Sequence, residues 1–245
     1  MSVIQQILKM KLTLKSIPPS GKTHSATVLF FHGSGDTGPN LIEWVRFLLG
    51  KDLQSPHIKF VYPTAPLQPY TPLDGEKSHV WFDRKSISID ALESRKSLAS
   101  SYELVNDLIE AELNNGIPIN RIVVGGFSMG GALALHTGYH VNTDVGGVFA
   151  CSAFLNRDSI VYESLKNKPH GKLPELLMFH GDRDTLVRPE WGSTTFNKLQ
   201  EMGVEGEFVS VKNTLHELKV KELVQIQEWL AKILPPIESD VSNKL

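Results

Sequence analysis

Residues 121–135 read RIVVGGFSMGGALAL, and this stretch combines the patterns of a strand, a sharp turn and a helix. Its apolar, β-branched first half is typical of a buried strand, and its second half favours a helix. Between them, residues 126–130 match the G-x-S-x-G pattern of a sharp strand-to-helix turn that presents a nucleophilic serine. Glycines two residues on either side of Ser128 let the strand and the helix approach closely. The pattern favours a nucleophile at Ser128 over an incidental serine in a Gly-rich turn.

Strand-like and helix-like segments alternate on both sides of this turn, which predicts an α/β fold with a mostly parallel central sheet and helices on both faces. We expect one domain over 1–245, with 1–11 and 238–245 peripheral or flexible. The expected strands are 12–17, 26–31, 58–62, 121–126, 145–151, 175–179 and 207–211. The expected helices are 40–49, 97–113, 130–140, 190–202 and 218–233. A Pro-Pro-Ser-Gly turn at 18–21 predicts that the first two strands pair antiparallel. Pro63 should end the third strand. The apolar sequences of the last four strands predict that they are buried on both faces.

Composition excludes several classes of protein. The 245 residues are 41% hydrophobic and carry a formal charge of −2, which argues against a nucleic-acid partner. Cys151 is the single cysteine, so no intrachain disulfide is possible and a reducing compartment fits best. The longest strictly apolar run is four residues, against the ~20 that a membrane-spanning helix needs. The N-terminus lacks the apolar stretch of a signal peptide, and the final SNKL matches the peroxisomal Ser-Lys-Leu address only in part.

A nucleophilic serine needs a general base and an acid that orients the base. With this turn, the expected chain order is serine, acid, histidine. His216 lies between the last expected strand and the last expected helix, so it is the candidate base. Asp182 and Asp184 follow the strand 175–179 at its carboxyl end, where catalytic groups gather. Either could be the acid, and Asp182 could instead hold the turn through backbone N–H groups.

The other histidines have simpler expected roles. His136 and His140 should be surface or packing residues of the helix after the turn. We expect the following to face solvent: His24, His57, His79 and His170.

A glycine-rich segment, HGSGDTG at 32–38, follows the second expected strand. In this architecture that position supplies one backbone N–H to the oxyanion that forms during acyl transfer. We assign the two oxyanion donors to the backbone N–H groups of Ser34 and Met129. A phosphate-binding loop is the rival interpretation, but no Gly-Lys-Ser/Thr follows the glycines.

Taken together, these segments resemble the acyl-protein thioesterase and lysophospholipase family of serine hydrolases. The resemblance covers about residues 24–236. It is carried by FFHGSGDTG (30–38), HIKFVYPTAP (57–66), YTPLDG (70–75), VWFDR (80–84), GIPINRIVVGGFSMGG (116–131), GVFACSAFLN (147–156), LPELLMFHG (173–181) and KILPPI (232–237).

The resemblance implies an α/β-hydrolase fold without a large cap domain and a triad of Ser128, Asp184 and His216. It also implies a cytosolic enzyme with no cofactor and no metal. Its substrates would be acylated (S-acyl) proteins or small acyl esters, with at most transient contact with a membrane surface. A general short-chain carboxylesterase or lysophospholipase without a protein substrate is the alternative.

One loop of this sequence differs from the corresponding loop of the acyl-protein thioesterases, and the difference bears on which substrates fit. Residues 72–80 read PLDGEKSHV, whereas the acyl-protein thioesterases carry a Met- and Asn-rich loop there that covers a long apolar channel. The better-known acyl-protein thioesterases also usually have Leu at the position of Ser34 and Gln at the position of Met129. Each buried CH₂ contributes about 0.8 kcal/mol, so a charged loop should favour short acyl groups. We expect Leu73 and Trp81 to contact the substrate.

Two functions from other classes compete with this hypothesis. A metal-dependent hydrolase could use His32, His180, Asp182 and His216, although no local H-x-H or H-E-x-x-H pair supports it. A binding protein that keeps the fold without catalysis is the other, and the presence of all three expected triad residues argues against it.

Overall fold

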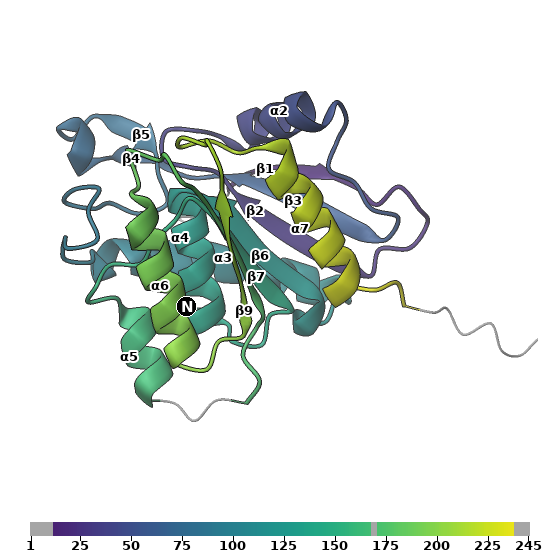
Figure 1. Cartoon of the computed structure of the whole chain (residues 1–245). Coiled ribbons are helices and arrows are strands. Elements are labelled where there is room, and N and C mark those ends of the chain that lie inside the picture. Colours follow the sequence, from purple (N-terminus) through teal and green to yellow (C-terminus); the bar gives the residue numbers. More distant parts are fainter. Residues whose placement is uncertain (1–11, 168–170, 238–245) are drawn as a thin grey trace, which may run out of the picture.

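The computed structural model describes residues 12–167 and 171–237 (Figure 1). The expectations for 1–11, His170 and 238–245 therefore lie outside the described residues. The strands are β1 Thr13–Ile17, β2 Ala26–Phe31, β3 Ile58–Thr64, β4 Leu67–Pro69, β5 Lys77–His79, β6 Ile122–Phe127, β7 Gly147–Cys151, β8 Leu176–Gly181 and β9 Gly206–Val211. The α-helices are α2 Gly38–Leu49, α3 Arg95–Asn114, α4 Met129–His136, α5 Ile160–Asn167, α6 Pro189–Glu201 and α7 Val220–Ile233. Short helical turns are η1 Thr71–Leu73, η2 Ile119–Arg121 and the π-helical η3 Thr137–Val141.

The main sheet has the strand order β1-β3-β2-β6-β7-β8-β9, and all its neighbours are parallel except β1 and β3. The expected antiparallel pairing of the first two strands is wrong, because β1 pairs with β3 and β2 lies between β3 and β6. The turn at 18–21 does not close a hairpin: the N–H groups of Ser20 and Gly21 donate to the residues just before β3. Strand β3 also continues through Pro63, which lies beyond the last β2–β3 pair at Val61.

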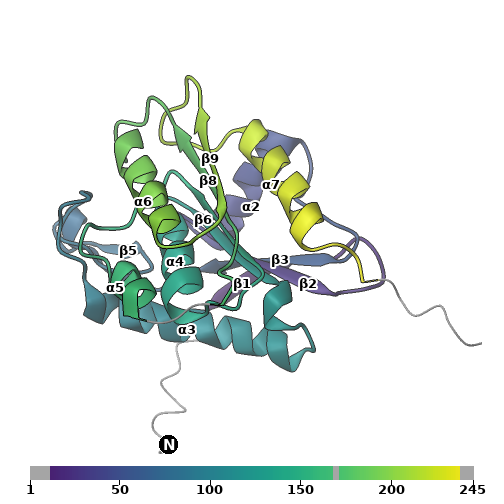
Figure 2. The ribbon, with the colours of Figure 1, turned by 60° about the horizontal axis from the view of Figure 1, so that its bottom comes forward.

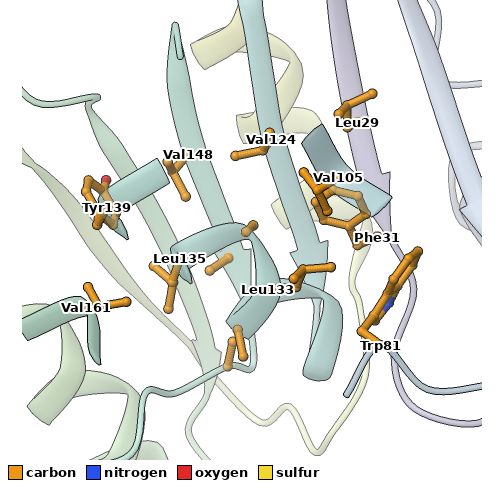
Figure 3. Packing of buried hydrophobic residues seen from close by; sticks show 14 of the residues in the cluster. Leu29, Phe31, Trp81, Val105, Val124, Leu133, Leu135, Tyr139, Val148 and Val161 are labelled. Carbon is orange, nitrogen blue, oxygen red and sulfur yellow. The ribbon is translucent and has the colours of Figure 1, made fainter. Parts of the chain in front are cut away.

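Helices cover both faces of this sheet (Figures 1 and 2). On one face α2 and α7 pack against apolar residues of the central strands, and on the other α3 to α6 do so. Figure 3 shows the hydrophobic cluster on the face covered by α3 to α6, which contains Phe31 and Val124 of the sheet and Leu133 of α4. Strands β6, β7 and β8 are buried throughout, as expected, but β9 is a largely exposed edge strand. Among the described residues, no helix is long and apolar enough to cross a bilayer.

Some local expectations need correction. His57 is buried rather than solvent-facing, because its Nε2 lies 2.7 Å from the Leu234 carbonyl at the end of α7. His136 is a packing residue, one of the two roles expected for it: it is buried and pairs with Glu93, with 3.2 Å between Nε2 and Oε1. His24, His79 and His140 are partly buried. The short helix α5 was not expected, since its eight residues hold little more than two turns of the apolar pattern.

Glu222, in the first turn of α7, makes the stability of the fold depend on pH. It is 1% exposed, and its Oε2 accepts the N–H of Lys219 at 2.7 Å. Burial raises the pKa of this carboxyl from 4.5 to about 7. Between these pH values the folded protein keeps a proton that the unfolded chain has lost, so stability falls as pH rises through this window. We expect Glu222 to lower the free energy of unfolding by about 2–3 kcal/mol across it.

The variant Glu222→Gln removes this titration and keeps an oxygen that can accept the Lys219 N–H. Urea unfolding at pH 5, 6, 7 and 8 should therefore give a flatter pH profile for the variant than for the wild type. Glu228→Gln, an exposed change on the same helix, serves as the control and should keep the wild-type profile. Coincident profiles for wild type and Glu222→Gln would contradict the assignment.

Candidate active site

Ser128 occupies a strained turn between β6 and α4. Its backbone has φ 54° and ψ −117°, a region that a side chain with a Cβ rarely adopts. Its N–H donates to the Cys151 carbonyl at 2.8 Å, and its own carbonyl accepts the N–H of Ala132 at 3.0 Å. These two bonds tie the turn to β7 and to the first turn of α4. The serine is thereby held at the carboxyl end of the central strand, at the N-terminus of the helix.

The two glycines of the pattern are required by the close approach of β6, α4 and β2. A Cβ on Gly126 would lie 2.3 Å from the backbone carbon of Gly130. A Cβ on Gly130 would lie 2.2 Å from the Phe31 carbonyl oxygen. Neither backbone can yield, because both belong to buried regular elements. The spacing of glycines around Ser128 is therefore a packing requirement of this turn.

The structure brings Ser128, His216 and Asp184 into one hydrogen-bonded chain. The Nε2 atom of His216 lies 3.0 Å from Ser128 Oγ, and its Nδ1 lies 2.6 Å from Asp184 Oδ2. An ionised carboxylate can only accept, so Nδ1 carries the proton and Nε2 is left to accept the serine hydroxyl. The His216 ring packs on Phe127, with 4.8 Å between ring centres.

Asp184 is a buried, fully engaged carboxylate. Its Oδ1 accepts the backbone N–H groups of Leu186 and Val187, each at 2.9 Å, while Oδ2 faces His216. Burial alone would raise the pKa of this carboxyl, but the hydrogen bonds from His216 and Val187 outweigh it and the pKa lies below its ordinary value. Asp184 is therefore ionised at neutral pH, as the orienting partner of an imidazole must be.

Asp182 has a different place. It is exposed, and its Oδ1 accepts the N–H of Thr214 at 3.4 Å. Its neighbour Arg183 donates its N–H to the Thr214 carbonyl at 3.0 Å. Asp182 thus contacts the loop that carries His216, and the contact to the His216 ring itself comes from Asp184.

The glycine-rich segment after β2 lies beside the serine. A Cβ on Gly33 would be 3.4 Å from Ser128 Cβ. His32 holds this segment in place: its Nε2 accepts the Ala65 N–H at 2.9 Å, so its Nδ1 donates to the Gly33 carbonyl at 2.6 Å. The backbone N–H groups of Ser34 and Met129 have no acceptor in the part of the chain that the structure describes. Ser34 lies in the cleft lining, whereas Met129 is buried and outside it, so the assignment of both N–H groups to the oxyanion stays a prediction.

Trp81 and Leu73 do not line the cleft at the serine. Trp81 is 1% exposed, and its Nε1–H donates to the His32 carbonyl at 2.9 Å (Figure 3). Its side chain therefore holds the glycine-rich segment in place through the His32 carbonyl. Leu73 is half exposed on η1, and the whole loop 72–80 lies outside the cleft lining. The predicted contact of Leu73 and Trp81 with the substrate therefore receives no support from their positions.

A small cleft of about 180 Å³ opens at Ser128. Its wall includes the following residues: Gly33, Ser34, Asp36, Trp44, Arg84, Ile87, Phe127, Ser128, Ala132, Ser152, Phe154, Leu186, Val187 and His216. Ligand pockets of proteins usually measure roughly 300–1,000 Å³, so this one fits a small group. Arg84, Ser152 and Phe154 were not expected here, although Arg84 ends the VWFDR segment and Ser152 and Phe154 lie in the GVFACSAFLN segment.

The four side chains of the metal hypothesis are engaged in other contacts. His180 is buried, with its Nε2 at 2.8 Å from the Val187 carbonyl, and both ring nitrogens of His32 have backbone partners. Asp182 and His216 make the contacts described above. Within the described residues, no group of three or more His, Cys, Asp or Glu side chains is arranged to hold a metal ion.

The parallel sheet covered by helices on both faces, with a serine on a strained turn after the central strand, defines an α/β-hydrolase fold. Residues 12–234 match the sequence family described as Phospholipase/Carboxylesterase, and the chain belongs to this family. It is 45% identical over 219 residues to lysophospholipase-like protein 1 of Mus musculus, covering 89% of this chain and 91% of that protein. Acyl-protein thioesterase 1 homolog 1 of Dictyostelium discoideum is 36% identical over 235 residues, 95% of this chain and all of that protein. The crystal structure of Zea mays acyl-protein thioesterase 2 superposes with a TM-score of 0.79 at 26% identity, covering 91% and 99% of the two chains.

Proposed function

We propose that the protein hydrolyses acyl esters and thioesters through an acyl-enzyme on Ser128, with His216 as general base and Asp184 as the orienting acid. The observation that carries this proposal is the hydrogen-bonded chain from Asp184 through His216 to Ser128 at the wall of a small cleft. The relatives named as acyl-protein thioesterases support the inclusion of thioesters among the substrates.

In the first half of the reaction, Ser128 Oγ attacks the acyl carbonyl while His216 Nε2 takes the hydroxyl proton. The charge that develops on the carbonyl oxygen is stabilised by the N–H groups of Ser34 and Met129 and by the N-terminus of α4. When the tetrahedral intermediate collapses, the bond to the leaving alcohol or thiol breaks and His216 returns the proton to it. Water then attacks the acyl-enzyme by the same route and releases the acid.

The cleft favours short acyl groups over palmitoyl. A volume of about 180 Å³ holds a few methylenes beside the carbonyl, and Phe154 and Ile87 contribute apolar surface to the lining. A palmitoyl chain would leave most of its length outside this cleft and gain little from burial. The proposal therefore leans toward short-chain esters and S-acyl groups, with S-depalmitoylation of proteins as the second candidate that the thioesterase relatives favour. A cytosolic location and a cofactor-free reaction stay predictions from the resemblance.

A chain-length series of 4-nitrophenyl esters, from acetate to palmitate, tests the proposal together with an S-acetyl and an S-palmitoyl peptide. We expect kcat/KM to be highest at two to four carbons and to fall by at least tenfold by eight carbons, because longer chains do not fit. Rates that rise with chain length would refute the preference for short chains. Absence of turnover on every ester and thioester, with no labelling of Ser128 by a fluorophosphonate, would refute the hydrolase itself.

A further inference from the structure

Arg84 places a positive charge in the wall of the cleft that also contains Ser128. The residue is partly buried and lies on the segment between β5 and α3. Its guanidinium carbon is 5.1 Å from the ring centre of Phe82 and 5.7 Å from that of Phe154. Contacts with two aromatic rings hold the planar group in place and recover part of its lost hydration. Burial lowers the pKa of Arg84, yet an arginine stays charged in proteins.

Within residues 12–167 and 171–237, this guanidinium makes no salt bridge. Its Nε atom is buried without a hydrogen-bond acceptor, and no carboxylate lies within 4.0 Å of it in the described part of the chain. The adjacent Asp83 favours the charged form of Arg84 at longer range, but its two oxygens accept the N–H and the hydroxyl of Thr71 instead of pairing with the guanidinium. A cation that is partly removed from water and has a buried N–H without an acceptor gains from an anionic partner, which a ligand can supply.

Ser152 adds a second unpartnered polar atom to the same cleft. Its Oγ is buried and has no hydrogen-bond partner, and its backbone sits at φ 49°, in the left-handed region. Its N–H donates to the Phe179 carbonyl at 2.8 Å, and the preceding residue accepts the Ser128 N–H. The strained backbone thus fixes the Ser152 hydroxyl directly after Cys151, whose carbonyl accepts the N–H of the nucleophile Ser128.

Asp36 is the one carboxylate in the cleft lining, and it does not neutralise Arg84. Its Oδ1 accepts the N–H of Thr37 at 2.8 Å, at the start of α2. Phe154 lies against Arg84, and Ile87 is a further apolar residue of the cleft lining. In such surroundings a charged hydrogen bond is stronger than in water, which makes the region selective for an anion over a neutral group of the same shape.

We propose that Arg84, assisted by the Ser152 hydroxyl, binds an anionic group that the substrate carries within a few bonds of the scissile carbonyl. The inference rests on the proposed function and narrows its substrate class to short acyl esters or thioesters with a carboxylate. The carboxylate can belong to the acyl part, as in half-esters of short dicarboxylic acids, or to the leaving alcohol. The small volume of the cleft requires the charge to lie close to the reacting carbonyl in both cases.

Two pairs of esters with matched shapes separate charge from size. For the acyl part, an aryl hemisuccinate is compared with the aryl levulinate, in which a methyl group replaces one carboxylate oxygen. For the leaving group, 4-acetoxybenzoate is compared with 4-acetoxyacetophenone. Each rate is corrected for hydrolysis without enzyme. We expect the wild type to prefer the anionic member of one pair by about ten- to a hundredfold in kcat/KM, and the pair that shows it identifies the position of the carboxylate.

Arg84→Met should reduce this preference to near unity, and Arg84→Lys should keep part of it because the charge remains. Arg188→Met is the matched control: Arg188 also lies over an aromatic ring, that of Trp191 at 5.8 Å, but it is exposed and outside the cleft lining. Its preference ratio should equal that of the wild type. The wild-type ratios decide the matter even if an Arg84 variant fails to fold.

Equal turnover of anionic and neutral members in both pairs would overturn the role of Arg84 while leaving the hydrolase in place. An equal loss of both members in Arg84→Met would likewise overturn it, since it would indicate a structural role. Failure to hydrolyse any of the four esters would overturn the proposed function and this inference with it.

Discussion

Replacing Ser128 by alanine is expected to lower kcat/KM for a short-chain ester by about 10⁴- to 10⁶-fold. The hydroxyl is the group that forms the acyl-enzyme, and no other hydroxyl is paired with His216 Nε2 in the described structure. Without it, His216 and the oxyanion donors can act only on water, which accounts for the small remaining rate. Initial rates with 4-nitrophenyl acetate, corrected for the uncatalysed reaction, measure the loss.

The fold should survive this change. Serine already adopts the positive φ of 54° at this position, so alanine brings no new backbone strain. Its Oγ makes a single hydrogen bond, to His216, which is partly exposed. The midpoint of thermal unfolding should therefore shift by no more than a few degrees. Labelling by a fluorophosphonate should disappear, because the hydroxyl that reacts with it is gone. A well-folded Ser128→Ala protein that keeps a tenth of the wild-type rate would exclude Ser128 as the nucleophile.

The turn around Ser128 could be predicted from sequence because its determinants are local. The strand, the helix and both glycines lie within residues 121–135, and the steric contacts that require the glycines are made largely among these residues and Phe31. The pairing of β1 could not be predicted in this way. A Pro-Pro-Ser-Gly turn is compatible with a hairpin, but β3 and β6 occupy the two edges of β2 and leave β1 to pair with β3.

Chain order could locate candidates for the acid and the base, since the loops after parallel strands meet at one edge of the sheet. Chain order could not separate Asp182 from Asp184 without the family resemblance, because both residues lie in the same loop after the same strand. The difference arises from the path of the loop, which buries Asp184 against the N–H groups of Leu186 and Val187 and leaves Asp182 exposed.

The lining of the cleft was the least predictable part. Arg84 and Phe154 come from segments 70 positions apart, and no periodic pattern in residues 63–90 indicates which side chains face the serine. Trp81, which we expect from the sequence to contact the substrate, is a large aromatic residue packed in the core. Here its indole N–H is used to hold the His32 carbonyl. Sequence patterns record burial more clearly than they record the face of a cavity.

Asp184→Asn is expected to lower kcat by about 10⁴-fold, for a reason that the geometry makes specific. Two backbone N–H groups, of Leu186 and Val187, donate to Oδ1, so the amide oxygen of the asparagine must occupy that position. The amide NH₂ then faces His216 Nδ1, where it donates and places the ring proton on Nε2. The imidazole would present an N–H to Ser128 Oγ and could not accept its proton.

Asp182→Asn is the matched control, since it makes the same chemical change two residues away. The asparagine keeps an oxygen for the Thr214 N–H, which is a long contact of 3.4 Å at an exposed position, so kcat should stay within about tenfold of the wild type. The ¹⁵N shifts of the His216 ring provide a second readout, because the proton should move from Nδ1 to Nε2 in Asp184→Asn and remain on Nδ1 in Asp182→Asn. A larger kinetic loss for Asp182→Asn, or an unchanged tautomer in Asp184→Asn, would transfer the orienting role away from Asp184.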